Sequence, residues 1–277
     1  GENGITKGII NPAAFQRGVD AVKYFKGIIS SQHIEEIFAF ATAALRRASN
    51  ADKFIEAVKN ETGIKIEIIS GEKEAEYIYY GVHQAVELGV ETSLVMDIGG
   101  GSVEFILCNE NEIFWKGSFD IGAAILLEMF KPSDPANEGE INKMRDYFTE
   151  TLKPLIHACN KYSPVQLVGS SGSFDTLADV TAYRFHTPEI LAGKTEYSFD
   201  IHEIRQVISG LISSTHAERE QIKGIAAMRI DMIVVGSLLI KFVIEKLGIN
   251  KIKLSSYALK EGVLWQVMKK GKISAQE

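Results

Sequence analysis

Residues 97–104 read Asp97-Ile98-Gly99-Gly100-Gly101-Ser102-Val103-Glu104. An apolar run, Ser93 to Asp97, leads into this stretch, and a second run, Val103 to Cys108, follows the glycines at once. Short apolar runs bounded by glycine are typical of buried strands. We therefore predict two strands joined by a glycine turn, with a third strand at Ile113 to Gly117.

The glycine turn has the composition of a phosphate site. Glycines let the backbone turn tightly and approach a ligand, and their N–H groups can converge on an anion. Ser102 adds a hydroxyl, and Glu104 points to the same side of its strand because it lies two residues further on. Asp97 stands where a carboxylate can hold a metal ion or a water. The alternative is a hairpin with a glycine bulge, but three glycines flanked by two acids exceed what a hairpin needs.

A second turn, Gly169-Ser170-Ser171-Gly172-Ser173, follows a predicted strand at Val165 to Val168 and precedes a helix. Backbone N–H groups and hydroxyls at the start of a helix can bind an anion. Such Gly/Ser turns are common, so this one carries little weight alone. It gains weight because the same α/β chain contains the glycine turn.

Two charged positions are weaker candidates. Arg46 and Arg47 follow an apolar run at Ile37 to Ala41, and the planar guanidinium suits phosphate oxygens, although a solvated pair is the simpler interpretation. Glu74 lies in the first turn of a helix predicted over Glu72 to Leu88. Acids there usually interact with the helix dipole, so the pattern alone does not single it out.

Composition excludes several classes of protein. Hydrophobic residues make up 45%, charged residues 24%, and the net charge of −6 argues against general nucleic-acid binding. The most apolar stretch, Met232 to Leu247, is interrupted by Lys241 and Glu245 and falls short of the ~20 apolar residues that span a bilayer. We expect a cytoplasmic protein with no membrane partner. Cys108 and Cys159 match no metal or redox spacing and are expected to be free thiols.

The order of elements predicts an α/β fold. A single long helix is expected over Ile141 to Tyr162, and another from Met228 to Leu247. We predict one domain from residues 1–80 together with the end of the last helix, about 268–277. Residues 81–267, with both turns, form the second domain.

Six stretches resemble, in order and spacing, the exopolyphosphatase/guanosine-pentaphosphate phosphohydrolase (Ppx/GppA) family. The resemblance covers nearly the whole chain and implies the fold of the actin, sugar-kinase and heat-shock-chaperone superfamily: two ribonuclease-H-like α/β domains with a cleft between them. The stretches are Ala41 to Asn50, Ile69 to Ala75, Asp97 to Glu104, Gly169 to Ala178, Arg229 to Ile233 and Leu259 to Gly262.

The resemblance implies a role for each candidate residue. Glu74 matches the general base that activates water, while Asp97 and Glu104 match the acids that organise Mg2+ and water. Arg46 matches a phosphate-binding arginine. The substrate-binding backbone and hydroxyl groups would come from Gly99, Gly100, Gly101 and Ser102 and from Gly169, Ser170, Ser171, Gly172 and Ser173.

The implied reaction is release of terminal orthophosphate from inorganic polyphosphate or guanosine pentaphosphate, with Mg2+ as cofactor. Hydrolysis of a phosphoanhydride needs charge neutralisation and an aligned water, which these residues can supply. The resemblance makes a homodimer plausible. A non-catalytic polyphosphate- or alarmone-binding module is the alternative, and a kinase or chaperone relative ranks last.

One departure from the family concerns the start of the chain. Family members begin with a strand that carries an Asp-x-Gly-Ser-Asn-type phosphate loop, and Gly1-Glu2-Asn3-Gly4 does not match it. We therefore expect the first domain to be incomplete and this exact polypeptide to be weakly active or inactive.

Overall fold

The structure is a computed structural model that describes residues 8–32, 34 and 36–274. The chain divides into two compact units, Gly1–Gly71 and Glu72–Glu277, which are described separately. The predicted domains, 1–80 with 268–277 and 81–267, remain a prediction, and residues 1–7 and 275–277 lie outside the described residues.

The smaller unit is two helices and a short connecting helix beside a two-stranded parallel sheet. Its long first helix begins at Pro12, because the Asn11 side chain accepts a hydrogen bond from the Ala14 N–H at 2.7 Å and Pro12 occupies the first helical position. Val19, Phe54 and Val58 form its core. The elements are α1 (Pro12–Ser31), β1 (Ala39–Ala41), α2 (Ala43–Arg46), α3 (Ala51–Thr62) and β2 (Ile66–Ile68).

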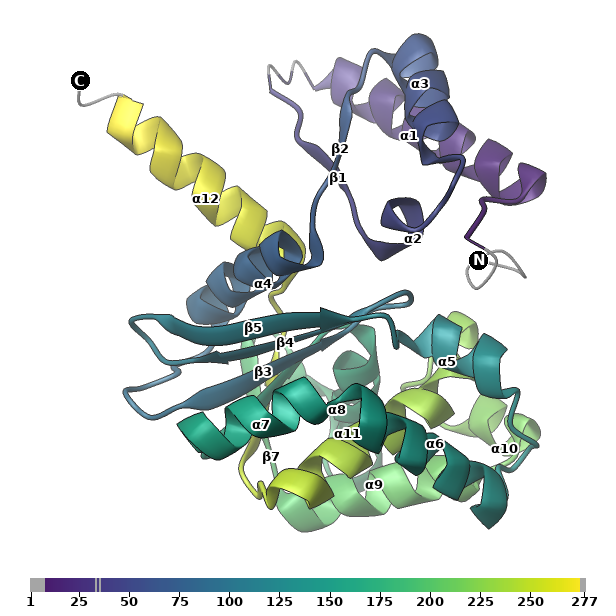
Figure 1. Cartoon of the computed structure of the whole chain (residues 1–277), viewed down its shortest axis with the longest axis vertical. Coiled ribbons are helices and arrows are strands. Elements are labelled where there is room, and N and C mark those ends of the chain that lie inside the picture. The colour runs from purple at the N-terminus through teal and green to yellow at the C-terminus, as the bar shows by residue number, and fades with distance from the viewer. Residues whose placement is uncertain (1–7, 33, 35, 275–277) are drawn as a thin grey trace. The chain divides into compact units, whose positions relative to one another are not determined.

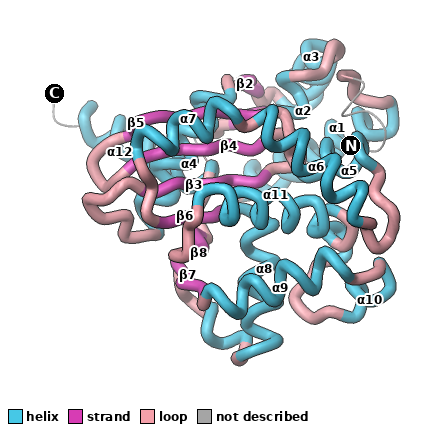
Figure 2. The backbone as a smooth tube through the Cα atoms, turned by 60° about the horizontal axis from the view of Figure 1, so that its bottom comes forward, coloured by secondary structure: helices cyan, strands magenta, loops and turns pink. Residues whose placement is uncertain are grey.

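The larger unit is built on a six-stranded mixed sheet in the order β5-β4-β3-β6-β8-β7, which can be followed in Figure 2. β3, β6 and β8 run parallel to one another, whereas β4, β5 and β7 are antiparallel to their neighbours. The strands are β3 (Ser93–Ile98), β4 (Val103–Cys108), β5 (Ile113–Phe119), β6 (Gln166–Ser170), β7 (Glu196–Phe199) and β8 (Ile252–Ser255).

Helices cover both faces of this sheet, so its central strands are apolar on both sides. Alternate residues such as Leu94, Met96 and Phe105 pack against the larger set of helices, and Val95 and Ile106 pack against α4 (Figure 1). The helices are α4 (Gly71–Ala85), α5 (Ala123–Phe130), α6 (Glu138–Thr151), α7 (Lys153–Tyr162), α8 (Ser171–Phe185), α9 (Ile201–Ser213), α10 (His216–Gln221), α11 (Met232–Leu247) and α12 (Leu259–Ser274).

Three expectations about secondary structure were wrong. The helix predicted over Ile141 to Tyr162 is two helices that meet at Leu152, because Pro154 lacks the N–H that a continuous helix requires. The helix predicted from Met228 begins at Met232, after a 3-10 turn at Ala227–Arg229. The short edge strand β7 was not predicted at all.

No described helix is both long and apolar enough to cross a bilayer.

Candidate active site

A row of polar side chains crosses the sheet on the face that α4 covers. The strand register pairs Asp97 with Glu104, Glu104 with Ser118, and Asp97 with Ser170. Paired residues on adjacent strands point to the same face, so these four side chains lie side by side. They follow the apolar residues of β3, β4 and β6 that pack under α4. The buried face therefore changes from apolar to acidic at the end of β3.

Asp97 is buried and firmly held. Its Oδ2 accepts hydrogen bonds from the Ser170 hydroxyl at 2.6 Å and from the Ser171 hydroxyl at 2.7 Å. Burial raises the pKa of Asp97 because it disfavours the charged form, and the two hydroxyls act against this by stabilising the carboxylate. The carboxylate is thus fixed in one orientation.

Glu104 lies beside Asp97 and is almost completely buried. Its Oε1 accepts a hydrogen bond from the Ser118 hydroxyl at 2.6 Å. Burial, with the nearby charges of Glu74 and Asp97, raises the pKa of Glu104 to about 8, and hydrogen bonds from Ser118 and Ser102 oppose the rise. Three predicted catalytic carboxylates are therefore close enough to affect one another.

Glu74 reaches this cluster because of its place on α4. The apolar residues Ile78, Val82 and Ala85 of α4 pack against the sheet, and Glu74 lies one turn before Ile78 on the same side of the helix. Glu74 is 7% exposed, whereas Glu72 in the same first turn is exposed to solvent. Glu74 therefore lies over the end of the sheet at which Asp97 and Glu104 are found.

The glycine turn, Gly99 to Gly101, forms a tight connection whose carbonyl groups are used by α5. The carbonyl oxygen of Gly99 accepts a hydrogen bond from the Ala123 N–H, and that of Gly100 accepts one from the Ala124 N–H at 3.0 Å. Within the described part of the chain, the N–H groups of Gly100 and Gly101 donate to no protein acceptor. They remain available for an anion.

Gly122 is a part of this arrangement that the sequence analysis missed. A Cβ atom at Gly122 would lie 2.4 Å from the carbonyl carbon of Gly100 and 2.5 Å from the nitrogen of Gly101. Only a glycine lets the start of α5 come this close to the turn.

The stretch Gly169 to Ser173 is not a loop. β6 ends at Ser170 and α8 begins at Ser171, which adopts a left-handed φ of 66° that is uncommon for serine. Gly169 packs against the Phe174 ring, since a Cβ there would lie 2.0 Å from a ring carbon. The hydroxyls of Ser170 and Ser171 are used to hold Asp97.

Both turns nevertheless line one cavity of about 550 Å3 in the larger unit. Gly99 and Gly100 contribute from the first turn, and residues 171–173 contribute from the second. The cavity thus brings together segments about 70 positions apart in the chain, as expected for two elements of one site.

Charged residues that the sequence analysis did not single out complete the lining. Arg229 covers Gly172: a Cβ on that glycine would overlap the guanidinium. Lys260 also lines the cavity, as does Asp175, whose pKa is raised by burial and held down in part by Arg229. Arg229 begins one of the six stretches that resemble the family, and its positive charge could have marked it as a candidate phosphate ligand.

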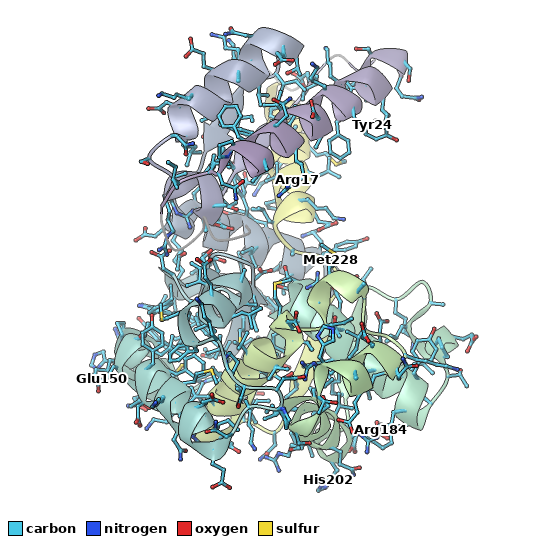
Figure 3. All side chains as sticks on the ribbon, turned by 90° about the vertical axis from the view of Figure 1, so that its right-hand side faces the viewer. Arg17, Tyr24, Glu150, Arg184, His202 and Met228 are labelled. Carbon is cyan, nitrogen blue, oxygen red and sulfur yellow. The ribbon has the colours of Figure 1, made fainter. Side chains whose placement is uncertain are left out.

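Met228 lies at the rim of the same cavity and is 76% exposed. Figure 3 shows Met228 well separated from His202, which lies in the first turn of α9.

Arg46 lies in the smaller unit at the end of α2, where its Nη1 donates to the carbonyl of Ile69 at 3.0 Å. Its role in phosphate binding remains a prediction.

The acids suit a magnesium ion that is shared with the substrate. Among the described residues, no cluster of three or more His, Cys, Asp or Glu could hold a metal ion unaided. Magnesium, however, prefers oxygen donors, keeps several waters and is usually held by one or two carboxylates together with substrate phosphates. Asp97 and Glu104 provide such donors. Burial is the largest cause of the raised pKa of Glu104, followed by the negative charges of Glu74 and Asp97, and a cation would neutralise those charges.

Comparisons with known proteins find relatives over nearly the whole chain. The family model described as "Ppx/GppA phosphatase family" matches residues 2–271. Exopolyphosphatase 1 of Mycobacterium tuberculosis is 26% identical over 260 residues, which are 94% of this chain and 75% of that protein. The corresponding protein of Mycobacterium leprae is also 26% identical, over 94% of this chain and 76% of its own length.

Solved structures resemble the chain over nearly its full length. A crystal structure of an exopolyphosphatase from Cytophaga hutchinsonii is 41% identical, with a TM-score of 0.93 over 98% of this chain and 86% of that one. The PPX-GPPA enzyme of Aquifex aeolicus is 26% identical, with a TM-score of 0.76 over 94% of this chain and 84% of that chain. These matches confirm the predicted family resemblance and the α/β fold.

Proposed function

The chain belongs to the Ppx/GppA phosphatase family, and from that premise we propose that this phosphatase hydrolyses terminal phosphoanhydride bonds of inorganic polyphosphate. The observation that carries the proposal is that Glu74, at the start of α4, lies near Asp97 and Glu104, which are paired on the sheet whose two turns line the cavity. The names of the curated relatives support polyphosphate as the substrate.

The backbone and basic groups of the cavity would bind the terminal phosphate. The N–H groups of Gly100 and Gly101 would donate to its oxygens, and Arg229 and Lys260 would neutralise their charge. Because each phosphate unit carries negative charge, these donors must offset the repulsion from the neighbouring acids.

Glu74 would act as the general base. A water oxygen attacks the terminal phosphorus, its proton passes to the Glu74 carboxylate, and the anhydride P–O bond breaks so that the shortened chain leaves with the bridging oxygen. Asp97 is held by two hydroxyls and would orient the water rather than exchange protons.

Mg2+ would be held by Asp97 and Glu104, where it supplies positive charge to the phosphate oxygens and to the carboxylate cluster. Glu104 is then ionised at neutral pH, since a neighbouring cation lowers the pKa of a carboxyl group.

Orthophosphate release by the purified full-length protein tests this proposal. We expect release from long-chain polyphosphate in the presence of Mg2+ and none after chelation with EDTA. Guanosine pentaphosphate is assayed in parallel, because it carries the same kind of terminal anhydride. Polyphosphate binding without release from either substrate would contradict the proposal and favour a non-catalytic binding module.

A further inference from the structure

Arg219 is a buried arginine that the sequence analysis did not single out. It lies on the short helix α10, whose other residues are partly or fully exposed, yet only 3% of its side chain is exposed. A guanidinium stays charged in a protein, so a buried one requires acceptors for its donors. The acceptors of Arg219 therefore show what it holds in place.

The guanidinium joins three segments of the larger unit. Its Nε donates to the carbonyl oxygen of Ile230 at 2.7 Å, just before α11. Its Nη1 donates to the carbonyl oxygen of Ser214, between α9 and α10. Its Nη2 donates to Asp134 Oδ1 at 2.7 Å, in the connection between α5 and α6. The Asp134 carboxylate is held in turn, because its Oδ2 accepts from the backbone N–H of His216.

One of these three segments carries Arg229, which directly precedes Ile230. Residues 226–228 are exposed to solvent, so this part of the segment has little packing of its own. Ile230 is the first buried residue after them, and its carbonyl is the group that Arg219 binds. Arg219 therefore fixes the backbone immediately after Arg229.

The Arg229 side chain has no such fixed point of its own. It lines the cavity and covers Gly172, where a Cβ would lie 1.6 Å from Nη2 of Arg229. Within the described part of the chain, no protein acceptor receives a hydrogen bond from this guanidinium. Its donors are thus available to phosphate oxygens, and its place in the cavity depends on its backbone.

We propose that Arg219 is a positioning residue for substrate binding: through the Ile230 carbonyl it sets the backbone that directs Arg229 towards phosphate in the cavity. This inference rests on the proposed role of Arg229 in binding phosphate. Without the guanidinium, the buried Ile230 carbonyl would lose its partner, and the segment would shift to let water reach it. Arg229 would move with the segment, whereas the proposed catalytic acids are on other elements, α4, β3 and β4.

Arg219→Lys tests the proposal in the full-length protein, because lysine keeps the charge but lacks the planar set of donors. We expect about a tenfold rise in the KM for polyphosphate and in the Kd for tripolyphosphate, as for loss of one hydrogen bond to a charged group. The Kd is measured by calorimetry in EDTA. The kcat at saturating substrate should stay within about threefold. Arg205→Lys is the matched control, since Arg205 is an exposed arginine on α9 whose Nη2 donates to Asn250 at 2.9 Å.

A double variant shows whether the effect passes through Arg229. In an Arg229→Gln background, Arg219→Lys should cause no further rise in KM or Kd. A general loosening of the fold would instead add its effect to that of Arg229→Gln. Circular dichroism and thermal unfolding establish that each variant is folded at the assay temperature.

Three results would overturn the inference: a folded Arg219→Lys variant with the KM and Kd of Arg205→Lys, an equal rise in the Arg229→Gln background, or a loss of kcat at constant KM. If Arg219→Lys does not fold, Asp134→Ala removes the partner of Nη2 at an exposed position, and an unchanged Kd would refute the proposal. A wild-type protein that binds tripolyphosphate but releases no phosphate would instead refute the proposed function, and the Kd values would still test the positioning role.

Discussion

The two turns that line the cavity differ in how their polar groups are used. At the glycine turn, carbonyl groups bind the start of α5, and among the described residues the N–H groups of Gly100 and Gly101 donate to no protein acceptor. The second turn, residues 169–173 between β6 and α8, is called the serine turn here. Its Ser170 and Ser171 hydroxyls both donate to Asp97. The first turn is thus open to a ligand, whereas the second holds a proposed catalytic group. Similar turn sequences can therefore support one reaction by binding substrate or by orienting a carboxylate.

Removing the charge that the serine turn holds should have the largest effect. We expect Asp97→Asn to lower kcat by about 10²- to 10⁴-fold, the range for loss of a positioned acid–base or water-orienting group. Stability should be unchanged or higher, because the variant removes a buried carboxylate whose charged form is disfavoured by burial. Steady-state kinetics and thermal unfolding measure the two effects. A variant that keeps kcat, or loses it only by unfolding, would contradict the role of Asp97.

Blocking the glycine turn should have the next largest effect. A methyl group in Gly122→Ala would meet Gly100 and Gly101 at about 2.5 Å and displace the turn. We expect kcat/KM to fall about a hundredfold, mainly through weaker phosphate binding. Gly89→Asn is a control at a glycine with left-handed φ and open space around it, where asparagine is tolerated. Equal kcat/KM in the two variants would show that the turn does not bind substrate.

Weakening the serine turn without removing the carboxylate should have a smaller effect. Ser171→Ala leaves Asp97 with one hydroxyl donor instead of two. A hydrogen bond to a charged group contributes about 1.5–3 kcal/mol, so we expect kcat to fall about tenfold. Ser213→Ala, which removes an exposed hydroxyl on α9, is the control. A rise in KM at unchanged kcat would mean that the serine turn binds substrate, as is proposed for the glycine turn.

The acidic row also predicts a pH dependence of stability. In the metal-free protein, the pKa of Glu104 is about 8, above its ordinary 4.5, so the folded state binds more protons than the unfolded state between these values. Stability conferred by protonated Glu104 is complete below about pH 4.5 and is lost as pH rises through 8. The Tm measured in EDTA should therefore fall over this window, and Glu104→Gln should reduce the slope. If the Tm of Glu104→Gln falls with pH as steeply as that of wild type, Glu104 is not the group whose raised pKa causes the fall.

Sequence reasoning identified what depends on local pattern. The strands around the glycine turn and the family resemblance both rest on short stretches of sequence. The split between α6 and α7 could have been predicted from Pro154, because a proline inside a predicted helix usually ends or kinks it.

What sequence reasoning missed depends on register and packing. Ser118 contacts Glu104 because β4 and β5 pair in one register, and Arg229 covers Gly172 because the segment before α11 packs on α8. No local pattern marks Ser118 for that role, and the charge of Arg229 does not reveal which glycine it covers. Glu74 was found only through the family resemblance, since its proximity to Glu104 depends on how α4 lies on the sheet.

The most direct test of the account compares Glu74→Gln with Glu72→Gln. Both residues lie in the first turn of α4, but Glu74 is buried next to Glu104, and Glu72 is exposed to solvent. We measure kcat for orthophosphate release from polyphosphate at saturating substrate and Mg2+. The account predicts a loss of about 10²- to 10⁴-fold for Glu74→Gln and a kcat within about twofold of wild type for Glu72→Gln. Wild-type kcat in folded Glu74→Gln, or an equal loss in both variants, would contradict it.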